Sequence, residues 1–271
     1  MQKSEQGSQS VDWRKRDQTS GTKPARPERA PTRTKIKKSY GIACCRFNKK
    51  NRPEILLVCK RYTYSYSIFV HGNYNSGSDS QLVQLFNGMT NDEKNDILSL
   101  NFIQIWYRIW STTKPCLSSF FMAKNKFDTT FLIDSGVRLR RLIAQSTQTD
   151  RIWEIPKGRK KYKSEPNIHC AIREFAEETG VTKKHYKIFP ESTRACSYVD
   201  GNVRYKNVYY LALANHNIIP QVNFARPEQA EEVADIKWMT IEHIRLIDSS
   251  GRLENLVRPM FNFMKKYTKK H

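Results

Sequence analysis

The spacing of apolar and polar positions changes twice along this chain. Residues 40–47 and 54–59 are short apolar runs joined by a polar turn at 48–53, which is typical of two paired strands. From about 62 to 148 the spacing becomes helical: Phe102, Ile105, Trp106, Ile109 and Trp110 recur at i, i+3, i+4, i+7 and i+8. The pattern predicts helices here, with this aromatic stripe either in their core or exposed as a platform for stacking bases.

Strand patterns return after residue 149. Residues 151–156, 186–189, 193–199, 205–214 and 232–238 favour strands, and residues 167–179 favour a helix between the first two of them. Thr240 is a plausible cap for a short helix, and residues 253–267 predict a last one. A set of strands with one central helix and flanking helices predicts an α/β/α sandwich.

The helical block is too long to be a loop of a compact domain. We therefore predict an inserted all-α domain at 62–148, flanked by the two parts of one α/β domain at 39–61 and 149–271. Residues 1–38 are polar and basic and bury too little apolar area to fold, so they predict a disordered basic N-terminal arm.

The formal net charge is +21, from 47 Lys and Arg against 26 Asp and Glu, and it is spread along the chain. Such a field attracts polyanions, with an RNA backbone the first expectation and a merely solubilising surface the alternative. Apolar stretches long enough for membrane insertion and an apolar signal region are both missing. Six scattered cysteines without CxxC pairs favour reduced thiols in a cytoplasmic protein.

Three carboxylates are the main candidate chemistry. Glu174, Glu177 and Glu178 fall at i, i+3 and i+4, so a helix places them on one face, and Gly180 is suited to end that helix. Close anions repel each other unless a cation lies among them, and oxygen ligands suit Mg²⁺ or Mn²⁺. A solvated acidic helix face is the alternative.

The spacing of these residues resembles the Nudix box, Gly-x5-Glu-x7-Arg-Glu-U-x-Glu-Glu-x-Gly-U, in which U is apolar. Glu165 and Arg173 stand at the positions of its first glutamate and its arginine. One departure is that six residues, not five, separate Gly158 from Glu165. The resemblance implies a Nudix α/β/α sandwich that hydrolyses a diphosphate linked to another group.

The resemblance also implies roles for the residues of the box. Glu174, Glu177 and Glu178 would be metal ligands, and Arg173 and Glu165 would pair and brace the loop against the helix. An alternative is that Glu165 reaches a second metal.

Outside the box, Glu232 stands in a context in which Nudix enzymes have a glutamate that reaches the metals, as a ligand or general base. Its neighbour Glu231 is a rival, and both could be ordinary surface carboxylates. A basic loop before the helix would contact RNA or other phosphates, or would simply be solvated. Its members are Lys157, Arg159, Lys160, Lys161 and Lys163.

Phrases at 60–71, 85–90, 106–110 and 153–158 resemble the mRNA-decapping Nudix enzymes of large cytoplasmic DNA viruses. That implies capped mRNA as substrate, with m7GDP and 5′-monophosphate RNA as products, and a location in the host cytoplasm, a viral factory or the virion. The candidates for stacking on the cap are Phe69, Tyr198, Tyr205 and Tyr209. Diphosphoinositol polyphosphate hydrolysis and a non-catalytic RNA-binding module are the alternatives, and the sequence leaves the oligomeric state open.

Overall fold

A computed structural model describes residues 35–110, 117–147, 149–200, 203–215 and 218–269. The strands are β1 (Lys35–Phe47), β2 (Pro53–Lys60), β3 (Trp153–Glu154), β4 (Lys157–Gly158), β5 (Tyr186–Asp200), β6 (Val203–Ala214) and β7 (Val233–Met239). The helices are α1 (Tyr64–Val70), α2 (Asp79–Asn87), α3 (Asn91–Ser99), α4 (Phe102–Ile109), α5 (Leu117–Phe127), α6 (Val137–Ala144), α7 (Asn167–Thr179), α8 (Pro227–Glu232), α9 (Ile241–Ile247) and α10 (Arg252–Thr268). A π-helix (Asp128–Leu132) and a 3₁₀ turn (Lys183–His185) complete the set.

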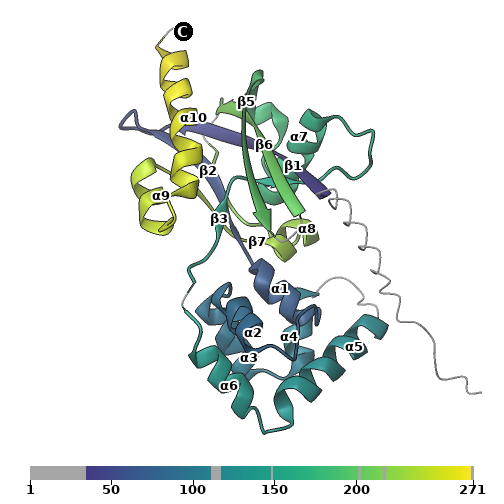
Figure 1. Cartoon of the computed structure of the whole chain (residues 1–271). Coiled ribbons are helices and arrows are strands. Elements are labelled where there is room, and N and C mark those ends of the chain that lie inside the picture. Colours follow the sequence, from purple (N-terminus) through teal and green to yellow (C-terminus); the bar gives the residue numbers. More distant parts are fainter. Residues whose placement is uncertain (1–34, 111–116, 148, 201–202, 216–217, 270–271) are drawn as a thin grey trace, which may run out of the picture. The chain divides into compact units, whose positions relative to one another are not determined.

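One sheet organises the described residues of 35–61 and 149–269 (Figure 1). Its order is β3-β2-β1-β6-β5, with β4 paired to β1 and β7 paired to β2. β1 and β6 run parallel from the Lys35–Val203 pair to the Cys45–Leu213 pair. This long pairing joins segments that lie far apart in the sequence.

Side chains of β1 alternate between the two faces of the sheet. Ile42 and Cys44 pack in the cluster that contains Phe175 of α7, whereas Cys45 packs in the cluster that contains Met260 of α10. Helices therefore cover both faces, and the predicted α/β/α sandwich is confirmed.

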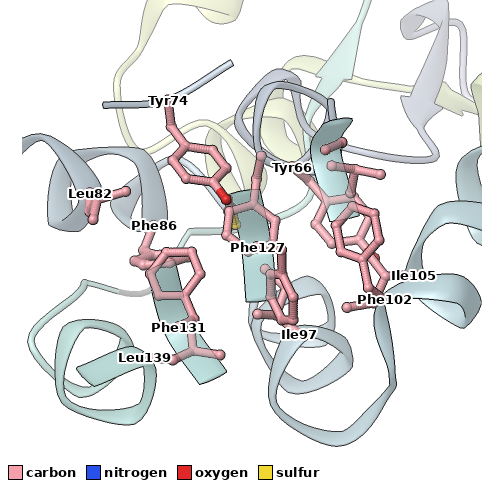
Figure 2. Close-up of a cluster of buried hydrophobic side chains, with 14 of the residues drawn as sticks. Tyr66, Tyr74, Leu82, Phe86, Ile97, Phe102, Ile105, Phe127, Phe131 and Leu139 are labelled. Carbon is pink, nitrogen blue, oxygen red and sulfur yellow. The ribbon is translucent and has the colours of Figure 1, made fainter. Parts of the chain in front are cut away.

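Helices α1 to α6 have a hydrophobic core of their own (Figure 2). Phe69, Phe86 and Phe131 are fully buried in it, and the ring centroids of Phe69 and Phe86 lie 5.6 Å apart. Thr90 and Glu93 form a capping box at the start of α3. The aromatic stripe of α4 belongs to the same core through Ile105 and Trp106. We propose that residues 62–148 form an inserted domain on this basis.

Two expectations need correction. β1 begins at Lys35, so residues 35–38 are part of the sheet and not of a disordered arm; residues 1–34 lie outside the described part of the chain. Glu232 ends helix α8 instead of starting a strand, because Pro227 occupies the first helical turn and favours a helix start there.

The structure also bears on the cysteines and on membrane insertion. Cys44, Cys45, Cys59, Cys170 and Cys196 are free, and Cys116 lies outside the described residues. Among the described residues no helix combines the length and apolarity needed to cross a bilayer.

Candidate active site

Helix α7 sets the geometry of the three box glutamates. Its apolar side, with Ala171 and Phe175, is fully buried against the sheet, which fixes its rotation. Gly180 follows with φ of 72°, a left-handed conformation that ends the helix. Glu178 is buried, with 2% of its surface exposed, whereas Glu174 and Glu177 are partly buried.

Arg173 ties the acidic face to the preceding loop. Its Nε donates to Glu165 Oε1 at 2.9 Å, and its Nη1 donates to Glu174 Oε1 and Glu177 Oε2, each at 2.8 Å. The other oxygen of Glu165 accepts from the backbone N–H of Lys161 at 2.8 Å. These donors, Arg173 foremost, hold the pKa of Glu165 at about 2. Both oxygens of Glu165 are engaged, which favours the bracing role over ligation of a second metal.

Lys60, at the end of β2, brings three more carboxylates together. Its Nζ lies 2.9 Å from Glu178 Oε1, 3.3 Å from Glu154 Oε1 and 3.4 Å from Glu232 Oε2. Burial raises the pKa of Glu178 to about 7 although Lys60 and Lys157 oppose the shift. The second oxygen of Glu178 accepts from the backbone N–H of Lys157 at 2.9 Å. The structure thus joins Glu232 to the box glutamates.

The sequence predicted that the clustered glutamates would repel each other unless a cation lay among them, and the structure places Lys60 and Arg173 there. Lys60 and Arg173 each pair with three carboxylates and offset part of their mutual repulsion. No group of three or more His, Cys, Asp or Glu among the described residues is arranged as a metal cluster. Repulsion is therefore reduced without a bound metal, and some negative charge is left for one to offset.

Other observations show that a divalent ion fits. The donors are hard carboxylate oxygens, and Lys60 already places one positive charge among three of them. Glu231 Oε1 is buried with no hydrogen-bond partner in the described chain, so a cation would satisfy it. A Cβ at Gly158 would lie 2.0 Å from Glu174 Oε2, so a larger residue there would push the Glu174 carboxylate out of its place. The candidate ligands remain Glu174, Glu177, Glu178 and Glu232.

Most of the basic loop borders these carboxylates. Lys157 forms an ion pair with Glu154, and Lys161 Nζ lies 2.9 Å from Glu177 Oε1. The carbonyl of Arg159 accepts from Arg173 at 2.8 Å. Lys160 lies 5.5 Å above the ring of Tyr40, and Lys163 is exposed. Lys157 and Arg159 are the two side chains of this loop that line the adjoining cavity.

A cavity of about 590 Å³ opens beside the carboxylates. Lys60, Glu154 and Glu232 line one part of it, and Tyr198 and Tyr205 line another. These two rings are stacked, with centroids 4.9 Å apart and planes 8° from parallel. Tyr64 of α1 also lines it and is 65% exposed.

Two of the four cap-stacking candidates were wrong. Phe69 is fully buried in the core of the helical insertion, and Tyr209 is buried under α10, so neither ring can receive a base in this structure. Tyr198 and Tyr205 stay candidates. Sequence reasoning assigned no role to Lys60, Glu154 and Tyr64, although the phrases at 60–71 and 153–158 contain all three.

Comparisons with known proteins fit this geometry. A model of the NUDIX domain matches residues 131–262. The mRNA-decapping protein g5R of African swine fever virus (strain Badajoz 1971 Vero-adapted) is 37% identical over 245 residues, which cover 87% of this chain and 97% of that protein. The chain therefore belongs to the Nudix family, with viral proteins named for mRNA decapping among its relatives.

Two more distant matches complete the comparison. A putative mRNA-decapping protein of Acanthamoeba polyphaga mimivirus is 25% identical over 224 residues, covering 71% of this chain and 60% of that protein. A crystal structure of a C. elegans Ap4A hydrolase is 15% identical with a TM-score of 0.45, covering 84% of this chain and 98% of that one. Nudix hydrolases generally need a divalent metal, which agrees with the donor set described above.

Proposed function

We propose that this protein removes the 5′ cap of mRNA, releasing m7GDP and 5′-monophosphate RNA, and that it uses Mg²⁺ or Mn²⁺. The observation that carries the proposal is that Lys60, which pairs with the buried Glu178, lines a cavity together with Glu154, Glu232 and a stacked tyrosine pair. The similarity to proteins named for mRNA decapping supports the same substrate.

The residues divide the work of phosphoryl transfer. A bound divalent ion would neutralise phosphate oxygens and lower the pKa of the attacking water. Glu174, Glu177 and Glu178 would hold it on α7. Glu232, whose side chain is 60% exposed at the cavity, is placed to accept the proton of the water. The water oxygen then bonds to phosphorus, and the P–O bond to the leaving phosphate breaks.

The tyrosine pair supplies a surface for the cap. Methylated guanine is flat and cationic, and such groups stack favourably on aromatic faces. Tyr198 is 50% exposed and shares the cavity with Tyr64, which arises from the segment just after β2. We therefore assign the base of the cap to the space beside Tyr198 and Tyr205.

Cations on β1 and β6 supply a surface for the RNA backbone. The paired segments 35–38 and 203–206 carry five of them and no acidic residue. None of the five forms an ion pair within the described chain, and all are at least partly exposed. They are Lys35, Lys37, Lys38, Arg204 and Lys206. Ser39 and Asn207, which follow on the same strands, line the cavity, so this surface leads away from the proposed active site.

Cap-labelled RNA incubated with Mg²⁺ or Mn²⁺ tests the proposal. Wild-type protein should release m7GDP, and Glu178→Gln should lower the rate more than about 100-fold, since even residues that support metal ligands cost about 10–100-fold when changed. Glu191→Gln, at an exposed position on β5, is the control and should keep full rate. The proposal fails if m7GDP is absent, or if the Glu178 variant is as fast as wild type.

Diphosphoinositol polyphosphates are the second candidate substrate, because the same cations suit any densely charged phosphate. Uncapped RNA should inhibit a decapping enzyme strongly at low salt and leave an enzyme for small phosphates unaffected.

The free thiols of the described cysteines suit the reducing host cytoplasm, where we propose that the protein takes part in the turnover of host mRNA.

A further inference from the structure

Gln229 is an amide side chain that is completely buried next to the catalytic helix. Its Nε2 donates to the backbone carbonyl of Glu178 at 3.0 Å, and its Oε1 accepts from the backbone N–H of Asn223 at 2.8 Å. Burying an amide is unfavourable unless its polar atoms are bonded, and here both ends are. A polar residue at this position therefore has a specific structural task.

The first task is to cap helix α7. The last four carbonyls of a helix have no partner within it, and α7 ends at Thr179, so the carbonyl of Glu178 is one of them. The N–H of Gly180 makes the last helical bond, to the carbonyl of Ala176 four residues back, and the left-handed φ of Gly180 then turns the chain away before the carbonyl of Glu178 gains a helical partner. Gln229 supplies the missing donor at the residue whose carboxylate is the most buried of the site.

The second task concerns Glu232, three residues further along α8. This helix has six residues, too few to be stable without tertiary anchors. One anchor is Gln229, and the other is the carbonyl of Glu232, which accepts from the backbone N–H of Arg61 at 2.9 Å. The side chain of Glu232 is 60% exposed, so packing does little to hold it. Its place opposite Glu178, with which it shares Lys60, therefore depends on how α8 is anchored to α7.

We propose that Gln229 is a positioning residue that sets the carboxylate of Glu232 against the metal-binding face of α7. The inference rests on the proposed role of Glu232. It extends the active site to a buried residue that touches neither substrate nor metal. A displacement of about 1 Å in a catalytic group can cost about 100-fold in rate, so loss of this anchor should act on kcat more than on KM.

Gln229→Met tests the proposal, because methionine has nearly the same length without the two polar ends. We expect kcat on capped RNA to fall about 10- to 100-fold with KM changed less than about 2-fold. The affinity for Mn²⁺, followed by electron paramagnetic resonance, should weaken several-fold, a readout that needs no turnover. Gln81→Met, at an exposed position of α2, is the matched control and should match wild type.

A double-mutant cycle with Glu232→Gln separates positioning from general damage. If Gln229 acts through Glu232, adding Gln229→Met to Glu232→Gln should cost less than about 3-fold more. Equal losses of rate in both backgrounds would overturn the proposal, as would full kcat in Gln229→Met. A circular-dichroism melt of each variant ensures that rates are compared on folded protein.

The outcome can be told apart from failure of decapping. If capped RNA is not cleaved but a diphosphoinositol polyphosphate is, the proposed substrate is wrong and the cycle is run on the diphosphoinositol polyphosphate. If Glu232→Gln alone leaves the rate on every cleaved substrate unchanged, the role of Glu232 is wrong and the proposal for Gln229 falls with it.

Discussion

Arg173 connects more of the site than any glutamate does. Its guanidinium bonds to Glu165, Glu174 and Glu177, and it also reaches the carbonyl of Arg159. The planar group offers five donors in a fixed arrangement, which a lysine at this position would not reproduce. The loop and the helix are thus held in one register by a single side chain.

The Arg173–Glu165 pair should make the free energy of unfolding depend on pH in the acid range. The pKa of Glu165 is about 2 in the folded protein, below its ordinary value of about 4.3 in an unfolded chain, so the pair stabilises the fold above that ordinary value. This contribution is lost as the pH falls toward 2. Urea unfolding should show Glu165→Gln to be less stable than wild type at pH 7, with the difference vanishing near pH 2. A difference independent of pH would contradict it.

Burial predicts the reactivity of the described thiols. It raises the pKa of Cys45 to about 12 and that of Cys59 to about 11, and it raises the pKa of Cys44 as well. Because the thiolate is the reactive form, iodoacetamide at pH 8 should modify these three far more slowly in folded protein than in urea. Mass spectrometry of labelled peptides checks this, and fast labelling of Cys45 in folded protein would refute it.

At the scale of elements, we expect the stability of helices α1 to α6 to depend on their aromatic core. Binding of the mRNA cap should depend instead on the tyrosine pair of the sheet. Phe69 contacts Phe86, Phe127 and Phe131 inside that core. Phe69→Ala should lower the free energy of unfolding by about 3–5 kcal/mol, measured by denaturant titration. Phe69→Leu should keep wild-type affinity for m7GDP, and a selective loss of that affinity would restore Phe69 as a cap ligand.

Tyr198 should behave in the opposite way. Half of its surface is exposed and its ring lies on Tyr205, so removing it opens no deep cavity. Tyr198→Ala should weaken m7GDP binding by about 1–3 kcal/mol in a calorimetric titration, as loss of a base-stacking ring does, while the melting temperature changes little. Unchanged binding would place the cap elsewhere.

Patterns of nearby residues were sufficient to predict helices and their caps, because these elements depend on residues close together in the sequence. The helix of Glu174, Glu177 and Glu178 follows from its spacing, and the cap of α9 follows from Thr240. The contacts that complete the site are long-range: Lys60 meets Glu178 across 118 positions of sequence. Exposure decided between the aromatic candidates, since a sequence places Phe69 and Tyr198 on equal terms. Such contacts depend on how strands pair, which periodicity does not specify.

At the scale of the whole molecule, the charge of +21 should make catalysis on RNA depend on salt. For single-stranded RNA the logarithm of affinity falls with the logarithm of salt by about 0.7 per phosphate contact. Replacing Lys37, Arg204 and Lys206 by Gln should reduce that slope by about 2 and leave cleavage of a short capped dinucleotide unchanged. Filter binding at several KCl concentrations measures it, and an unaltered slope would move the RNA path off β1 and β6.

Lys60, at the end of β2, should also affect how stable the protein is when no divalent ion is bound. Because Lys60 already places one positive charge among three carboxylates, stripping the enzyme with a chelator leaves part of their negative charge offset. Chelated protein should stay folded, with a melting temperature lowered only by the lost binding of the ion, and should regain full activity on adding Mn²⁺. In the metal-free protein Lys60 thus supplies part of the positive charge that a divalent ion would supply in the active enzyme.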